Sequence, residues 1–392
     1  MLQGFEFATA TRIVFGTGKL SELPQHVREL GVTRVLLVTG SSLARRSQLQ
    51  EQLAATGMVL QRSSVTGEPT VEQLRAELPA LREAGVQAVI SVGGGSVIDA
   101  GKALAALAAN GGDPLDYLEV VGRGAALTQP SLPFIAVPTT AGTGAEVTRN
   151  AVLGSEQHRV KASLRSPHML PRLALIDPDL LQGAPPAVLR ASGLDALSQL
   201  IEPLLSVRAN PLTDALARAG LVRSARSLRP AVLHGPDAQQ REDLALASLF
   251  GGLCLANSGL GAVHGFAGPV GGMFAAPHGA VCAALLPHVL EVNLQALDSR
   301  GGGQPARARF DELAQLLTAD PHAHAVDAIR WVRGLCAELQ VPGLSSYGMR
   351  EADVPQLVSK AKQASSMRGN PLTLSDEELT RIASQALAAV GS

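Results

Sequence analysis

The spacing of apolar positions changes about halfway along this chain of 392 residues. In the first half, short apolar runs alternate with segments of helical period. They predict strands at 33–39, 59–63, 88–92, 134–137 and 174–178, and helices at 47–55, 71–84 and 96–109. Strands that alternate with helices form a parallel sheet with helical crossovers. We therefore predict an α/β domain with a parallel sheet over residues 1–181.

Beyond about Leu180 the pattern becomes helical. Long Leu- and Ala-rich segments with a period near 3.6 occur at 193–205, 211–228, 239–256 and 310–317. They predict an all-helical domain over residues 182–392. Within it, Leu244–Leu290 contains no Asp, Glu, Lys or Arg, but Gly, Pro and His interrupt the run before an apolar span of about 20 residues is reached. We therefore expect buried helices packed around a site, and no membrane span.

The overall composition excludes several classes of function. Lys and Arg number 33 against 34 Asp and Glu, so the net charge of -1 provides no field that attracts nucleic acid or an anionic membrane. Three widely spaced cysteines and no basic, apolar leader favour a reducing, cytoplasmic location without a signal peptide.

A glycine turn links a predicted strand to a predicted helix at Gly93-Gly94-Gly95-Ser96. Glycines let backbone amides approach a pyrophosphate, and the helix N-terminus adds partial positive charge there. The turn lacks the GxGxxG spacing, so a plain tight turn remains the alternative. A second segment, Pro138–Thr148, places threonine hydroxyls and bare backbone at the carboxyl end of a strand, where ligands bind in open α/β sheets, although it also fits a polar connecting loop.

The helical half contains candidate metal ligands. Asp195 and Gln199 are four residues apart and share one helix face, and His264 and His278 lie in the charge-free stretch. A carboxylate and two imidazoles from separate helices suit a divalent metal with a position open to a substrate oxygen. The alternative is that both histidines are ordinary core residues with satisfied hydrogen bonds.

Taken together, these segments resemble the iron-containing alcohol dehydrogenases. The matching segments occur in order along most of the chain: Phe15-Gly16, GGGSVIDAGKA at 93–103, PTTAGTGAEVT at 138–148, Ile176–Pro178, Gly193–Ala196, Pro277–Gly279, Leu286–His288 and Gly369–Pro371.

The resemblance implies a dehydroquinate synthase-like architecture, with the active site in a cleft between an α/β dinucleotide domain and a helical domain. It implies an oxidoreductase that interconverts a small alcohol and its aldehyde or ketone, often as a homodimer. NAD or NADP would contact Gly40, Ser41, Gly94, Gly95, Ser96, Asp99, Thr139, Thr140, Thr143, Lys161 and Leu180. A divalent metal, Fe²⁺ or Zn²⁺, would be bound through Asp195, Gln199, His264 and His278. The residues expected to act in catalysis are Asp99, Lys161 and His278.

Three positions depart from the family pattern. Gln199 stands where the family usually has histidine, and an amide is a weaker ligand for a transition metal. Gly268 stands where a second histidine usually lies near the nicotinamide, so we expect water to carry the proton. Gly40 stands where NAD-preferring members tend to have aspartate, and Arg45 and Arg46 follow closely, which favours NADP or dual use.

These departures leave other functions open. One is a metal-independent reductase similar to the maleylacetate reductases, with Arg149, Lys161 and Arg368 as candidates for binding a substrate carboxylate. Another is a dinucleotide-binding protein that has lost catalysis. A lyase similar to the dehydroquinate synthases would require more basic residues than the sequence places near the site.

Overall fold

The computed structural model describes residues 4–40, 46–158, 160–300 and 304–390. The chain forms two compact units. Thr9–Thr140 and Gly144–Gln182 form the first, which we call the α/β unit. Gly183–Ser392 form the second, the helical unit, together with Ala141–Thr143 and the described part of Met1–Ala8. The change in apolar spacing near Leu180 therefore coincides with the end of the α/β unit.

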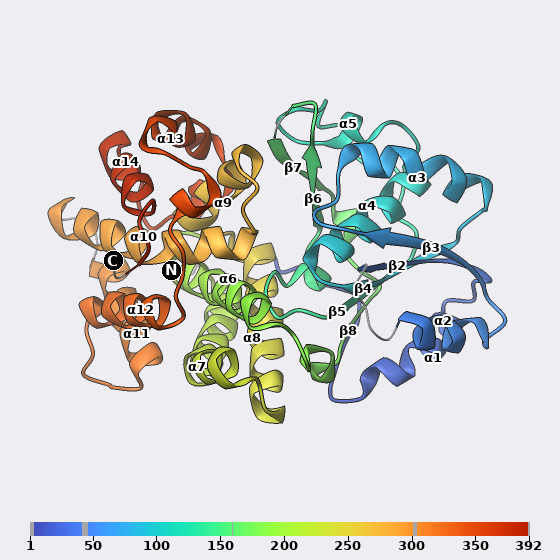
Figure 1. The fold of residues 1–392 in the computed structure, drawn as a ribbon, viewed down its shortest axis with the longest axis horizontal. Coiled ribbons are helices and arrows are strands. Elements are labelled where there is room, and N and C mark those ends of the chain that lie inside the picture. Colours follow the sequence, from blue (N-terminus) through green and yellow to red (C-terminus); the bar gives the residue numbers. More distant parts are fainter. Residues whose placement is uncertain (1–3, 41–45, 159, 301–303, 391–392) are drawn as a thin grey trace. The chain divides into compact units, whose positions relative to one another are not determined.

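The α/β unit is built on a six-stranded, entirely parallel sheet (Figure 1). Its strand order is β1-β8-β5-β4-β2-β3. The strands are β1 (Ile13–Phe15), β2 (Arg34–Gly40), β3 (Val59–Val65), β4 (Ala88–Gly93), β5 (Phe134–Pro138) and β8 (Leu173–Ile176). The central strands β4 and β5 are buried along their whole length, which explains why they read as unbroken apolar runs in the sequence.

Helices cover both faces of this sheet, as Figure 1 shows: α3 (Val71–Glu83) and α4 (Gly95–Asn110) lie on one face, and α1 (Leu23–Glu29) and α2 (Arg46–Ala54) lie on the other. Successive residues of β2 point to opposite faces. Leu36 and Val38 join the core under α3 and α4, whereas Val35 and Leu37 join the core under α1 and α2. The short helix α5 (Pro114–Tyr117) begins with an Asp113 capping box.

An antiparallel hairpin also belongs to the α/β unit. Strands β6 (Asn150–Ser155) and β7 (Val160–Arg165) pair with each other outside the main sheet. The sequence analysis placed no strands here and also missed β1, so it was wrong on these elements. Polar and small residues interrupt β6, charged and polar residues interrupt β7, and β1 is only three residues long, so none gives a clear apolar run.

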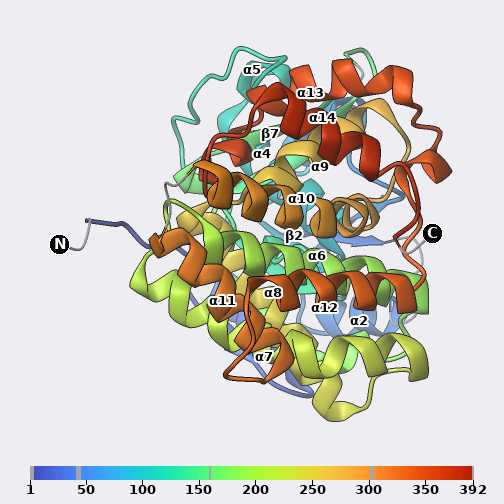
Figure 2. The same ribbon diagram turned by 90° about the vertical axis from the view of Figure 1, so that its left-hand side faces the viewer.

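The helical unit contains nine α-helices within the described residues: α6 (Pro186–Leu205), α7 (Pro211–His234), α8 (Ala238–Ser258), α9 (Ala262–Met273), α10 (His278–Arg300), α11 (Gln304–Thr318), α12 (Ala325–Glu338), α13 (Val354–Gln363) and α14 (Asp376–Gln385). Helix α6 is central, since it packs against α7, α8, α10 and α11. Figure 2 looks onto this unit, with α6 and α10 side by side. Gly193 and Gly220 allow close packing of α6 and α7, because a Cβ at either position would lie 2.2 to 2.5 Å from a leucine methyl group.

Short 3-10 helices complete both units: η1 (Lys19–Glu22), η2 (Ala145–Val147), η3 (Pro167–Met169), η4 (Pro178–Leu181), η5 (Leu344–Tyr347), η6 (Glu351–Asp353) and η7 (Ser365–Gly369). Helix α6 begins seven residues before the predicted start at Gly193, because Pro186 occupies its first turn, where proline costs no hydrogen bond. Helix α7 continues six residues past the predicted end at Leu228 and carries Pro230 inside it.

The charge-free stretch forms the buried interior of the helical unit. Helix α10 is long and apolar enough to cross a membrane, but most of its apolar window is buried against the other helices. Helices α8 and α9 are bent by 98° relative to each other at the break between them. All three cysteines, Cys254, Cys282 and Cys336, are buried free thiols.

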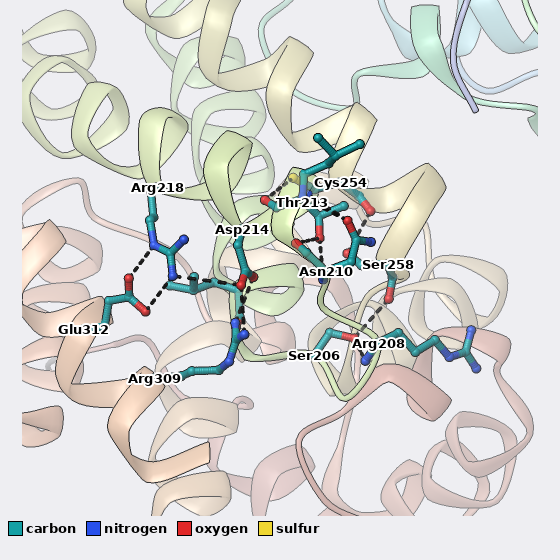
Figure 3. Close-up of polar contacts among 12 residues, drawn as sticks. Ser206, Arg208, Asn210, Thr213, Asp214, Arg218, Cys254, Ser258, Arg309 and Glu312 are labelled. Atoms are coloured by element: carbon teal, nitrogen blue, oxygen red, sulfur yellow. Dashed lines mark hydrogen bonds and ion pairs between the residues drawn. The ribbon is translucent and has the colours of Figure 1, made fainter. Parts of the chain in front are cut away.

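Ion pairs connect α7 with α11 (Figure 3). The buried carboxylate of Asp214 on α7 accepts two hydrogen bonds of 2.9 Å from the Arg309 guanidinium on α11. Arg309 also donates to the carbonyl oxygen of Leu204, near the end of α6, at 2.6 Å. On the neighbouring surface Arg218 pairs with Glu312. Arg309 therefore fixes three helices, among them the one that carries the candidate metal ligand Asp195.

Candidate metal centre and dinucleotide site

One face of α6 presents three buried polar side chains, Asp195, Gln199 and Glu202. Their spacing of i, i+4 and i+7 places them along a single stripe of the helix. Their exposed fractions are 2%, 3% and 6%. Burying polar groups this deeply costs free energy unless they form hydrogen bonds or ion pairs. The groups that face these three side chains therefore indicate what the side chains do.

His264 on α9 is held between two of these carboxylates. Its Nδ1 lies 2.6 Å from Glu202 Oε2 and its Nε2 lies 3.3 Å from Asp195 Oδ1. The other oxygen of Glu202 accepts a hydrogen bond of 2.7 Å from the backbone N–H of Val263. Glu202 thereby fixes the ring orientation and directs Nε2 toward Asp195, which is how outer carboxylates commonly orient a metal-binding histidine.

The start of α9 is positioned by the close approach of Gly261 to Glu202 and by a hydrogen bond to Asn370. A Cβ at Gly261 would lie only 2.9 Å from Glu202 Oε1, so a side chain there would displace the Glu202 carboxylate. Asn370 Oδ1 accepts a hydrogen bond of 3.2 Å from Ala262 N, and Asn370 also exchanges side-chain hydrogen bonds with Asn293 on α10. The Gly369–Pro371 segment of the sequence therefore acts as a support for His264.

His278 and Cys282 complete the group from the first and fifth residues of α10. A Cβ at Gly279 would lie 2.1 Å from the Ala191 carbonyl oxygen, so this glycine lets α10 approach α6 closely. His278 Nε2 lies 3.8 Å from Asp195 Oδ1, and the Cys282 Sγ atom lies 3.7 Å from Nε2 of His278 and 3.7 Å from Nε2 of His264. One ligand atom from each of Asp195, His264, His278 and Cys282 lies within 4.8 Å of all the others. This donor set fits a divalent metal.

The four groups shift one another's pKa values. Burial disfavours the charged form of each, but the surrounding charges outweigh it. The pKa of His278 rises to about 9, because the charges of Cys282 and Asp195 favour its protonated form. The same effects raise the pKa of His264 well above its usual value. The pKa of the Cys282 thiol and that of Asp195 are lowered, chiefly by the charges of the two histidines.

The predicted ligand Gln199 makes two contacts through its amide. Its Nε2 donates to the carbonyl oxygen of Gly142 at 3.4 Å, and a hydrogen bond from its amide contributes to the lowered pKa of Asp195. Its Oε1 is buried and has no hydrogen-bond partner among the described residues. The sequence analysis missed Cys282 and Glu202. Each had a signal in helical spacing: Cys282 follows His278 by four residues, and Glu202 follows Asp195 by seven.

The predicted pyrophosphate turn has the required backbone shape. Gly94 is the residue that caps the N-terminus of α4, a helix of 16 residues. It has no side chain that could accept a hydrogen bond from the first backbone amides of the helix. A Cβ at Gly93 would lie 2.6 Å from the Val97 side chain, and one at Gly94 would lie 3.3 Å from Thr140 Oγ1. Thr139 N donates to Gly93 O at 3.0 Å, which holds the threonine segment beside the turn. The arrangement fits a pyrophosphate bound on the helix N-terminus.

Asp99 and Lys102 of α4 support the adjoining segment. Asp99 Oδ2 accepts a hydrogen bond of 3.0 Å from Val152 N on β6. The fully buried Lys102 ammonium donates to the carbonyl oxygens of Ala145 and Asn150 at 2.7 and 2.8 Å, and burial lowers its pKa to about 8. Burial also raises the pKa of Glu146 to about 7. Lys102 therefore fixes the end of the threonine segment, a role that the sequence analysis did not assign.

The remaining predicted cofactor residues lie in varied surroundings. Lys161 on β7 forms an ion pair with Glu68 at 2.6 Å. Leu180 packs against the core beneath α1 and α2, and Thr143 belongs to the helical unit. Gly40 ends β2, where a Cβ would make an ordinary contact of 3.7 Å with Val97. Ser41 and Arg45 lie outside the described residues.

The basic side chains considered for a carboxylate substrate also differ in exposure. Arg149 is half-buried beside the hairpin, and Arg368 is exposed in η7.

A parallel sheet with a glycine turn at the start of a helix, followed by a helical unit carrying clustered metal donors, defines the class of metal-dependent, dinucleotide-dependent dehydrogenases with the dehydroquinate synthase-like fold. Residues 10–178 match the family described as iron-containing alcohol dehydrogenase, and residues 190–387 match its C-terminal part. The chain belongs to the iron-containing alcohol dehydrogenase family.

Individual relatives agree over nearly the whole length. The 1,3-propanediol dehydrogenase of Klebsiella pneumoniae is 33% identical, covering 97% of this chain and 98% of the relative. Alcohol dehydrogenase 4 of Schizosaccharomyces pombe is 32% identical, with 95% and 87% covered. A crystal structure of a 1,3-propanediol oxidoreductase superposes with a TM-score of 0.90 at 32% identity, covering 98% of this chain and 100% of the other. The predictions of family, fold class and oxidoreductase activity on alcohols and aldehydes are confirmed.

Proposed function

We propose that this protein is an NAD(P)-dependent, metal-dependent reductase of small aldehydes that also runs in the alcohol-oxidising direction. The observation that carries the proposal is the cluster of Asp195, His264, His278 and Cys282, buried except for the half-buried His278, whose donor atoms lie within 4.8 Å of one another. A core of ordinary satisfied histidines has no need for a carboxylate and a thiol at the same point.

The dinucleotide belongs to the α/β unit in this proposal. The glycine turn at Gly94, Gly95 and Ser96 offers backbone amides and the positive end of α4 to the pyrophosphate. Thr139 and Thr140 line the neighbouring strand end, and Asp99, Lys161 and Leu180 remain proposed contacts. Because no carboxylate occupies position 40 at the end of β2, we propose NADP or dual use over strict NAD use.

The metal belongs to the helical unit. When bound, a divalent ion polarises the substrate carbonyl oxygen and the reduced nicotinamide supplies hydride to the carbonyl carbon. Glu202 holds the His264 ring through Nδ1, so that Nε2 stays directed at the cluster. Asp195 and the surrounding apolar helices hold the ligands in a site of low dielectric.

Proton delivery differs from the usual family arrangement. Gly268 offers no side chain where an imidazole usually stands, and a Cβ there would meet no atom within 4 Å among the described residues. The open space suits a water molecule, and we propose that water protonates the alkoxide oxygen as it forms.

The test couples metal analysis to turnover. Purified protein is assayed for bound Zn²⁺ and Fe²⁺ and for oxidation of NADPH and NADH with a panel of small aldehydes, and for the reverse reaction with alcohols including 1,3-propanediol. We expect about one metal per chain and loss of activity with a chelator that added metal reverses. If the enzyme were active without bound metal and insensitive to the chelator, the metal would have no part in the proposed reaction. Turnover restricted to dicarboxylates would favour the metal-independent reductase.

Assembly is a separate proposal. Strand β3 ends the sheet, and Val59 at its start is 56% exposed. Pairing of this edge with its equivalent in a second copy would form a homodimer, which sedimentation analysis tests directly.

A further inference from the structure

The position of Cys282 separates it from the two other thiols of the chain. It lies one helical turn after His278, so both side chains project from the same face of α10. Cys254 and Cys336 instead direct their sulfur atoms at the carbonyl oxygens of Thr213 and Ala283. Cys282 is thus the thiol that the fold places among metal donors.

Four of the distances among the donor atoms are close to those of a tetrahedral metal site. Zinc lies about 2.0–2.2 Å from nitrogen or oxygen ligands and about 2.3 Å from sulfur, so tetrahedral neighbours are separated by about 3.4 Å for nitrogen and oxygen and about 3.6 Å for nitrogen and sulfur. The Cys282 Sγ atom lies 3.7 Å from each histidine Nε2. Asp195 Oδ1 lies 3.3 and 3.8 Å from the same two nitrogen atoms. These four of the six distances among the donor atoms lie within a few tenths of an ångström of the tetrahedral values, and the other two are at most 4.8 Å.

Gln199 is tied to another partner. Its amide nitrogen donates to Gly142 O, and its Cβ faces Gly251, where an added Cβ would lie 3.3 Å away. The amide nitrogen at the position of the family's usual histidine is thus directed at Gly142, its buried Oε1 has no hydrogen-bond partner among the described residues, and a thiol stands among the other three candidate ligands.

We propose that Cys282 is the fourth ligand of the metal, together with Asp195, His264 and His278, and that this set selects zinc over iron. The proposal rests on the proposed function, because it names a ligand of the metal which that function requires. Binding replaces the S–H bond of Cys282 with a sulfur–metal bond and releases the proton to solvent. Thiolate is a soft ligand, so it strengthens the preference for Zn²⁺ over Fe²⁺ beyond that of imidazole and carboxylate.

Cobalt(II) reports the sulfur ligand directly, because a cobalt–thiolate bond gives an intense near-ultraviolet charge-transfer band. We expect the full-length protein reconstituted with one Co²⁺ to show this band. Cys282→Ser should lose it while still binding cobalt, and the matched variant Cys336→Ser should keep it. Gln199→Ala should also keep it, because the amide is not a ligand.

The outcomes distinguish the thiolate ligand from the metal-dependent function. Stoichiometric cobalt without the band, or a band that survives in Cys282→Ser, overturns the thiolate ligand and leaves the metal-dependent function intact. Failure to bind Co²⁺ or Zn²⁺ at all overturns both. If Cys282→Ser fails to fold, the double variant Gln199→His/Cys282→Ser provides a histidine in exchange for the thiol. It should bind cobalt without the band.

Selectivity is measured by anaerobic reconstitution with equal Zn²⁺ and Fe²⁺, followed by elemental analysis. We expect the ratio of bound zinc to iron to fall at least about tenfold from the native protein to the double variant. An unchanged ratio would overturn selection by the thiol.

Discussion

At the scale of single residues, the site combines groups that sequence patterns can name with groups that they cannot. Asp195, His264 and His278 were predicted from their chemistry and their resemblance to family positions, and the structure brings them together. Cys282 was missed because a lone cysteine in an apolar helix is usually a core residue. Only the packing of α10 against α6 and α9 shows that its sulfur faces two imidazoles.

Gly40 permits a direct test of cofactor preference. A Cβ at this position would lie 3.7 Å from Val97, an ordinary contact, so Gly40→Asp should fold normally. Its carboxylate would repel a 2′-phosphate and accept from ribose hydroxyls. We expect kcat/KM for NADPH to fall at least about tenfold relative to that for NADH, equivalent to about 1.4 kcal/mol. The uncharged variant Gly40→Asn is the control, and an equal change in both variants would contradict the electrostatic explanation.

Gly268 tests the proposed water route. It lies four residues after His264 on α9, and a side chain has open space there. Gly268→His should restore an imidazole acid, raise kcat for aldehyde reduction roughly tenfold, and add a limb near pH 6.5 to the pH–rate profile. Gly268→Ala, which changes the helix without adding an acid, should leave the profile unchanged. A profile of Gly268→His that matches Gly268→Ala would show that this position does not supply the proton.

At the scale of elements, the strands that the sequence revealed are those buried on both faces. Strands β4 and β5 are continuous apolar runs and were predicted within a residue or two at each end. The hairpin β6–β7 was not, because its alternation is interrupted by Gly154 and by charged Lys161, and its partners lie in the hairpin itself. Helix ends were also misplaced where proline occurs inside a helix, as at Pro230.

The anchoring of α6, α7 and α11 by Arg309 gives a prediction of stability. Arg309→Met would leave the buried Asp214 carboxylate without its two hydrogen bonds. We expect the free energy of unfolding to fall by roughly 2–4 kcal/mol, measured by urea denaturation. Arg229→Met is the matched control, since its pair with Glu338 is more than 40% exposed on both sides and should contribute roughly 1 kcal/mol or less. Equal losses in the two variants would argue against a special role for the Asp214 anchor.

At the scale of the whole molecule, the sequence indicated two regions. The structure adds that one short segment of the first region belongs to the second unit. Ala141–Thr143 belongs to the helical unit although the residues on either side of it belong to the α/β unit. Its Gly142 packs against Ser192, where a Cβ would lie 2.8 Å away, and accepts the hydrogen bond from Gln199. Periodicity could not predict this crossing, because a segment of three small or polar residues has no period.

Metal binding should be strongly dependent on pH. In the metal-free protein the pKa of His278 is raised to about 9 from its usual 6.5, because neighbouring charges outweigh burial. That raised pKa stabilises the metal-free fold fully below pH 6.5, and the contribution is lost as the pH rises through 9. A metal must displace this proton and that of His264, whose pKa is also raised, so we expect its apparent affinity to increase by at least about tenfold per pH unit between pH 6.5 and 9.

Competition with a chelator at several pH values measures this slope, and thermal unfolding of the metal-free protein should show a falling Tm over the same range. His278→Asn should bind metal more weakly and with a shallower slope. An apparent affinity that is independent of pH would contradict the assignment of His278 as a protonated group in the metal-free state.

The support that Asn370 gives to the start of α9 has a consequence for the order of folding. The hydrogen bond between Asn370 and Ala262 spans 108 residues, and it helps to place the helix that carries His264. During synthesis from the N-terminus, Asp195, His264, His278 and Cys282 all leave the ribosome well before Asn370 does. A nascent chain therefore contains every ligand while the support is still missing. We expect lasting metal capture to be a late event in the maturation of this protein, completed only after the last helices have docked.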